Sequence, residues 1–175
     1  VPVVGKFTFA GAALGVGLVL LLGFVDQSAR TIPDLEGLFD LPILGAIPID
    51  KNVPNRKKGG RRPTPELLTD HSPPAEAIRN LRAGLSFLGT RDERRSFLLT
   101  SSVPGEGKSW ISANLAVAFG AQGDNTLIID LDLRNPTQHL IFGRARGPGI
   151  SDFLTQETPL KEFFQATDYD NVYLI

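Results

Sequence analysis

The stretch SFLLTSSVPGEGKS, residues 96–109, decides the fold of this chain. Its first six residues form a short apolar run with the length of a buried strand. Residues 110–122 then repeat apolar side chains at helical spacing and end before Gly123, a residue typical of helix ends. Strand, glycine loop, Gly-Lys-Ser and helix, in that order, are the context of a phosphate-binding loop, so the sequence predicts an α/β domain.

The residue types in this loop suit the binding of a triphosphate. Gly105 and Gly107 permit the unusual dihedral angles that turn successive backbone N–H groups inward. Lys108 can reach the β- and γ-phosphates, and the Ser109 hydroxyl can bind Mg²⁺. The first position of the motif holds Ser102 where glycine is usual. The residues expected around the phosphates of ATP are Pro104, Gly105, Glu106, Gly107, Lys108, Ser109 and Trp110.

A second element follows at 126–134, with the sequence TLIIDLDLR. It begins as a buried strand, and a right-handed crossover would place its carboxyl end beside the glycine loop. Asp130 and Asp132 would share one face of that strand, because side chains alternate. Two carboxylates beside a phosphate suit the holding of Mg²⁺ through water or the acceptance of a proton from an attacking hydroxyl. In the alternative interpretation, the two acids merely end the strand and cap the next turn.

The predicted catalytic residues are therefore Lys108, Asp130 and Asp132, and the predicted Mg²⁺ ligands are Ser109, Asp130 and Asp132. Three strands are expected, at 96–101, 126–131 and 171–175, and a short helix at 137–142. A complete sheet of this class has more strands. The fold class is thus an incomplete, P-loop NTPase-like parallel sheet within residues 74–175.

The residues before this domain differ in character. Residues 7–25 carry no charge, and 19 residues of helix would span about 28 Å, close to the thickness of a bilayer core. This predicts a transmembrane helix at 7–25, preceded by a periplasmic remnant at 1–6 and followed by a juxtamembrane segment at 26–50. A flexible linker at 51–73 is rich in Pro and Gly and contains six basic residues, namely Lys51, Arg56, Lys57, Lys58, Arg61 and Arg62. The basic cluster predicts a cytoplasmic location for the C-terminal part and an attraction to anionic lipid.

Composition excludes several classes of site. The formal net charge of −1 gives no electrostatic basis for a nucleic-acid partner. The chain has no cysteine and two histidines, which excludes disulfides and thiolate sites and disfavours a histidine metal cluster.

Charged residues also recur on one face of a predicted helix at 76–82, where Glu76, Arg79 and Arg82 are three residues apart. From the spacing alone this is a solvated face with weak i,i+3 pairing.

Taken together, residues 101–109, 114–116 and 130–136 resemble the bacterial tyrosine autokinases of capsule and exopolysaccharide synthesis. The apolar helix followed by Leu-Gly-Ala-Ile-Pro at 44–48 resembles their polysaccharide co-polymerase region. The resemblance implies ATP- and Mg²⁺-dependent phosphorylation of tyrosines on a neighbouring copy, at the bacterial inner membrane and with the polysaccharide synthesis and export machinery as a partner. It makes Lys108 and Ser109 Walker A residues and Asp130 and Asp132 Walker A′ acids, and it assigns Glu76, Arg79 and Arg82 to homo-oligomer contacts.

The sequence departs from this family on both sides of the phosphate-binding loop. A Walker B acid and a tyrosine-rich tail are not found within residues 1–175, nor are the periplasmic domain and first membrane helix of the family, so we expect a chain truncated at both ends and weakly active by itself. Two alternatives remain: an ATP-binding regulator of polysaccharide chain length without significant phosphotransfer, and a plain P-loop ATPase.

Overall fold

The computed structural model describes residues 2–25, 42–49, 72–90 and 96–175. Within 2–25, side chains are described for Gly5, Phe7, Thr8 and 11–21. Most of the predicted juxtamembrane segment 26–50 and all but the last two residues of the predicted linker 51–73 lie outside the described residues. The chain divides into two compact units, Val1–Ile43 and Leu44–Ile175.

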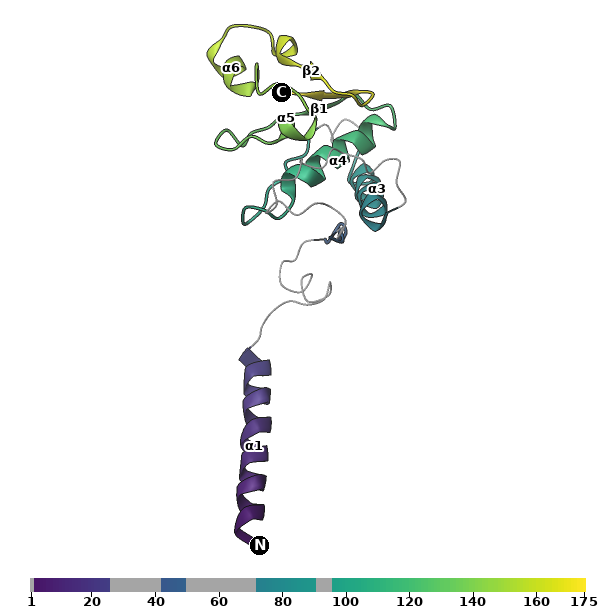
Figure 1. Ribbon diagram of the computed structural model, residues 1–175. Helices are drawn as coiled ribbons and strands as arrows, with labels where there is room; N and C mark the ends of the chain where they lie inside the picture. The colour runs from purple at the N-terminus through teal and green to yellow at the C-terminus, as the bar shows by residue number, and fades with distance from the viewer. Residues whose placement is uncertain (1, 26–41, 50–71, 91–95) are drawn as a thin grey trace. The chain divides into compact units, whose positions relative to one another are not determined.

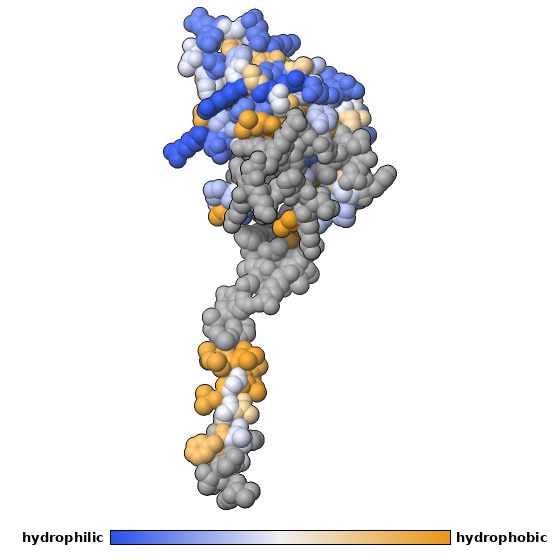
Figure 2. Space-filling view, in the orientation of Figure 1, coloured by the Kyte–Doolittle hydropathy of each residue, from blue (hydrophilic) through white to orange (hydrophobic). Residues whose placement is uncertain are grey.

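The first unit contains the 24-residue helix α1 (Pro2–Val25). Its described apolar side chains, among them Leu14, Val19 and Leu20, are largely exposed, and Figure 2 shows the apolar surface that they form. Among the residues that the structure describes with their side chains, no helix is both long enough and apolar enough to cross a membrane.

The second unit contains a small mixed sheet with the order β1-β3-β2. Strands β1 (Thr126–Ile128) and β3 (Val172–Leu174) are parallel, with Thr126 opposite Val172. The parallel pairing expected of the strands at 126–131 and 171–175 is therefore confirmed. Strand β2 (Gln165–Ala166), which was not predicted, runs antiparallel to β3, so the sheet is mixed and not parallel throughout. Only five residues join β2 to β3, and a link that short allows an antiparallel pair but no crossover.

The predicted strand at 96–101 is also wrong, because these residues belong to neither a strand nor a helix. Residues 96–99 and the residues of β1 both line a cavity of about 1390 Å³. Phe97 stacks on Phe119 with ring centroids 5.9 Å apart, whereas Leu98 is 82% exposed. The run has the composition of a strand, but without a hydrogen-bonded neighbour an extended segment forms no ladder.

Five helices complete the described part of this unit: α3 (Pro73–Ser86), α4 (Lys108–Gly120), α5 (Gln138–Ile141), α6 (Ile150–Thr155) and the 3₁₀ helix η2 (Leu160–Phe163). The predictions of helices at 76–82 and 137–142 are confirmed, and α4 begins two residues before the predicted start. Helix α4 packs on the sheet on one side and on α3 on the other, as Figure 1 shows. Because α4 is covered on both sides, its residues 113–118 are all buried.

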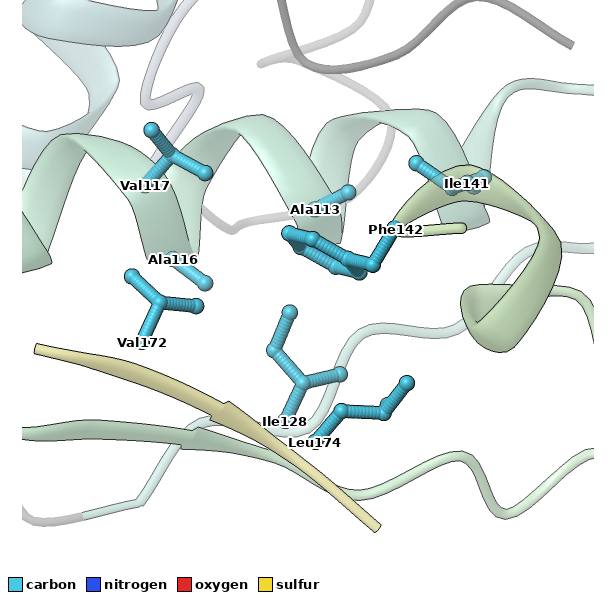
Figure 3. Packing of buried hydrophobic residues seen from close by; sticks show 8 residues of the cluster. All are labelled: Ala113, Ala116, Val117, Ile128, Ile141, Phe142, Val172 and Leu174. Atoms are coloured by element: carbon cyan, nitrogen blue, oxygen red, sulfur yellow. The ribbon is translucent and has the colours of Figure 1, made fainter. Parts of the chain in front are cut away.

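The core lies between α4, α5 and the sheet (Figure 3). It consists of Ala113, Ala116, Val117, Ile128, Ile141, Phe142, Val172 and Leu174. Alanines at the α4 positions that face the strands let the helix backbone come close to the sheet. Tyr169 closes one edge of this cluster through an edge-to-face contact with Phe142, with ring centroids 6.0 Å apart.

Gly120, the last residue of α4, lies directly against the chain that leads into β3. A Cβ atom at this position would be 2.6 Å from the Asp170 carbonyl oxygen and 2.6 Å from Val172 Cγ2. The Gly120 carbonyl also accepts a 3.1 Å hydrogen bond from the Asn171 side chain. The lack of a side chain at Gly120 therefore sets the distance between α4 and the sheet.

We predict that Gly120→Ala lowers the free energy of unfolding by about 1–3 kcal/mol, because the added methyl group meets backbone and a buried valine. The matched control is Gly84→Ala in α3, where a Cβ atom would meet nothing within 4 Å. That change should be neutral or raise stability by up to about 1 kcal/mol, because alanine is the better helix former. Thermal unfolding of the intact protein measures both changes, and an equal effect of the two substitutions would contradict this packing account.

Candidate functional site

The loop before α4 has the backbone that the glycines were predicted to provide. Gly105 and Gly107 both have a φ of +94°, and Gly107 is the N-cap of α4. A Cβ atom at Gly105 would meet nothing within 4 Å, so the dihedral angle, and not lack of space, requires glycine there. The first N–H groups of α4 have no partner within the helix, which suits the end of a helix for binding an anion.

Glu106 closes the loop on itself. Its carboxylate accepts hydrogen bonds from the Ser102 backbone N–H at 3.0 Å and from the Val103 N–H at 3.3 Å, and the Ser102 hydroxyl donates to it at 3.2 Å. Ser102, which departs from the usual glycine, therefore supplies a bond that glycine could not make. Pro104 has no N–H to donate, so its part in the loop is to fix the turn.

Lys108 and Asp132 meet at the start of α4. The Lys108 Nζ atom lies 4.0 Å from Asp132 Oδ2, and both side chains are half-buried. They come from different elements, because Lys108 begins α4 and Asp132 follows β1. The structure therefore brings together the cation and one of the two acids that the sequence singled out. Ser109 and Trp110 follow in the first turn of α4, and both are half-buried.

Asp130 has a different environment. Its Oδ2 atom accepts hydrogen bonds from the backbone N–H groups of Thr137 at 2.7 Å and Gln138 at 2.9 Å. Its Oδ1 atom accepts a third from the Asp132 N–H at 3.1 Å. The interpretation of Asp130 as a cap of the following turn therefore agrees with its contacts. Asp132 accepts one backbone bond, from Asn135 at 3.1 Å, through the oxygen that does not face Lys108.

This donor set fits Mg²⁺. The ion usually binds one or two carboxylates together with phosphate and water and needs no cage of protein groups. Among the residues that the structure describes, no three His, Asp or Glu side chains gather as a metal cluster. As protein ligands for Mg²⁺, the Asp132 oxygen that is directed at Lys108 and the hydroxyl of Ser109 would suffice. Asp130, with three N–H groups on its oxygens, would reach the ion more readily through water.

One residue of this site, Gln138, is not predicted from the sequence. It is buried, and it lines the same cavity as Lys108, Ser109, Asp130 and Asp132. Its side chain donates to the Ser109 carbonyl oxygen, 29 residues earlier in the chain. No local pattern indicates such a contact, because a glutamine in a four-residue helix is normally exposed.

The charged helix face is present on α3. Arg79 and Glu76 form an ion pair with an N–O distance of 3.0 Å, at the predicted spacing of three residues. Glu76 is exposed, Arg79 and Arg82 are half-buried, and the buried residues Ile78 and Leu85 belong to the same helix. The apolar face of α3 packs on α4 and leaves this charged group at the surface.

Comparison with known proteins gives the relatives of this chain. Tyrosine-protein kinase YwqD of Bacillus subtilis is 34% identical over 116 residues, which are 65% of this chain and 49% of YwqD. The chain is homologous to bacterial tyrosine kinases. Tyrosine-protein kinase etk of Escherichia coli is 27% identical over 169 residues, 89% of this chain and 23% of etk. The BceF tyrosine kinase domain has a similar structure, with a TM-score of 0.71 and 28% identity over 83% of this chain and 61% of that domain.

The chain therefore spans about half of YwqD and less than a quarter of etk. No family model matches it. The relatives confirm the resemblance to bacterial tyrosine autokinases, and the structural likeness agrees with a mixed α/β fold of that class.

The contacts of the two acids predict different effects on stability. Asp130→Ala should lower the free energy of unfolding by about 1–3 kcal/mol, because the N–H groups of the buried residues Thr137 and Gln138 lose their acceptor. Asp132→Ala removes one backbone bond at a more exposed site and should cost less than about 1 kcal/mol. Urea unfolding of the intact protein measures both. A loss for Asp132→Ala as large as that for Asp130→Ala would contradict the division of roles.

Proposed function

We propose that this chain is part of an ATP-dependent protein-tyrosine kinase that phosphorylates neighbouring copies of itself. The observation that carries the proposal is the placement of Lys108, at the end of a glycine loop, 4.0 Å from Asp132. Relatives named tyrosine-protein kinases support the reaction type, and a kinase of this type uses ATP.

In this proposal the loop binds the nucleotide phosphates. The N–H groups of residues 105–109 surround the phosphate groups, and the start of α4 adds its positive end. Lys108 leaves Asp132 for the phosphate oxygens, since a phosphate carries more negative charge than one carboxylate. When bound, Mg²⁺ would offset the charge on the β- and γ-phosphates, with the Ser109 hydroxyl, Asp130 and Asp132 as its holding groups.

The acids Asp130 and Asp132 also act on the tyrosine that accepts the phosphoryl group. The tyrosine oxygen forms a bond to the γ-phosphorus, the bond from that phosphorus to the bridging oxygen of ADP breaks, and a carboxylate at Asp130 or Asp132 takes the tyrosine proton. Asp132 has the carboxylate oxygen directed at Lys108, whereas Asp130 holds the loop that carries Asp132.

Self-association and the membrane are further parts of the proposal. Transfer to a neighbouring copy requires contact between copies, and the surface charges Glu76, Arg79 and Arg82 are the proposed contact. The uncharged residues 7–25 are the proposed anchor in the bacterial inner membrane, and the basic residues at 51–62 the proposed contact with anionic lipid. The kinase domain then faces the cytoplasm, and its activity regulates the chain length and export of capsule or exopolysaccharide together with the synthesis machinery.

The test compares Lys108→Met with Lys161→Met in the intact protein, using γ-labelled ATP and detection of phosphotyrosine. Lys161 is an exposed lysine of η2 and serves as the control for loss of one charge. We predict that Lys108→Met lowers tyrosine labelling at least about 100-fold, because the charge that meets the transferred phosphate is gone. Lys161→Met should label like the unmodified protein.

Equal labelling in Lys108→Met would contradict the proposal. ATP hydrolysis without phosphotyrosine in the unmodified protein would favour the plain ATPase. Binding of ATP with neither reaction would favour the regulator without phosphotransfer.

A further inference from the structure

Gln138 connects the two halves of the candidate site. Its backbone N–H donates to Asp130 Oδ2 at 2.9 Å. Its side-chain Nε2 donates to the Ser109 carbonyl oxygen at 3.0 Å and to the Ser112 hydroxyl at 2.9 Å. One residue is thus bonded to the acid that follows β1 and to the first turn of the helix that follows the glycine loop.

Ser112 extends this connection to Lys108. While it accepts the bond from Gln138, the Ser112 hydroxyl donates its own proton to the Lys108 carbonyl oxygen at 2.9 Å. Asp130, Gln138 and Ser112 therefore form a continuous chain of hydrogen bonds between the loop at 130–137 and the backbone of Lys108. A shift of either segment would strain these bonds.

The burial of the Gln138 side chain indicates that filling space in the core is not the sole role of this residue. Gln138 is 4% exposed, and its Oε1 atom is buried without a hydrogen-bond partner among the described residues. An unpaired buried acceptor is unfavourable, and a leucine of similar volume would avoid it. The benefit that offsets it is the fixed geometry between Ser109 and Asp130.

We infer that Gln138 is a positioning residue that couples the acid-bearing loop 130–137 to the start of α4, so that Mg²⁺ and nucleotide bind together. The inference rests on the proposed function, because it presumes that this site takes Mg²⁺ with a nucleotide. Gln138 fixes Ser109 and Asp130 relative to each other and does not itself touch the nucleotide. The phosphate loop and Lys108 do not need this bond in order to bind ADP without metal.

The experiment measures the affinity of the intact protein for ADP, once with Mg²⁺ and once with EDTA. Trp110, the single tryptophan of the chain, lies next to Ser109 and gives the fluorescence signal, and equilibrium dialysis checks it. In Gln138→Leu, the gain in ADP affinity on adding Mg²⁺ should fall roughly tenfold, since two hydrogen bonds of ordinary strength are lost. The affinity in EDTA should stay within about twofold.

Two further variants keep the test decisive. Ser112→Ala removes one of the two acceptors of Gln138 and should lower the Mg²⁺ gain about threefold; it decides the matter if Gln138→Leu does not fold. Gln156→Leu, at an exposed residue after α6, should leave the gain unchanged.

An unchanged Mg²⁺ gain in folded Gln138→Leu would overturn the inference, as would an equal loss of affinity with and without Mg²⁺. If Gln138→Leu does not fold, an unchanged gain in Ser112→Ala would overturn it. Failure of the unmodified protein to bind ADP at all would instead contradict the proposed function.

Discussion

The close packing of α4 on the sheet is the constraint on which the rest of this structure depends. Alanines at 113 and 116 and the bare backbone of Gly120 let the helix lie against β1 and β3. Since the glycine loop ends where α4 begins, this packing also fixes the loop relative to the carboxyl end of β1. Lys108 and Asp132, which are 24 residues apart in the chain, meet for that reason. The chemistry of the site thus follows from the volume of a few small side chains.

The two acids after β1 show how one local pattern can hold two roles. The carboxylate of Asp130 accepts hydrogen bonds from three backbone N–H groups and thereby fixes the conformation of the segment that carries Asp132. Asp132 keeps one oxygen directed at the lysine of the phosphate loop. By these contacts, Asp130 holds the backbone of the segment in place, and Asp132 has a carboxylate oxygen that can bind a ligand. Gln138 adds a link from that segment back to α4, so the site is held from both sides.

The parts of the fold that sequence predicts are those with local causes. Residues adjacent in the sequence determine the positive φ angles of Gly105 and Gly107, the helix that follows them and the apolar strand before Asp130. The run at 96–101 has the same apolar character, yet it forms no strand, because a strand depends on a neighbour that no local pattern reveals. The two-residue strand β2 is too short to show periodicity. The contact of Gln138 with Ser109 joins residues 29 apart, and only the fold shows it.

A crystal structure of the intact protein with ADP and Mn²⁺ would show where the phosphates and the metal bind, because Mn²⁺ replaces Mg²⁺ and can be located by its anomalous scattering. We predict that the N–H groups of residues 105–109 surround the β-phosphate, and that the metal lies between that phosphate and the carboxylate of Asp132, beside the Ser109 hydroxyl. Phosphates bound away from the loop, or a metal on the side of the sheet opposite Asp132, would contradict it.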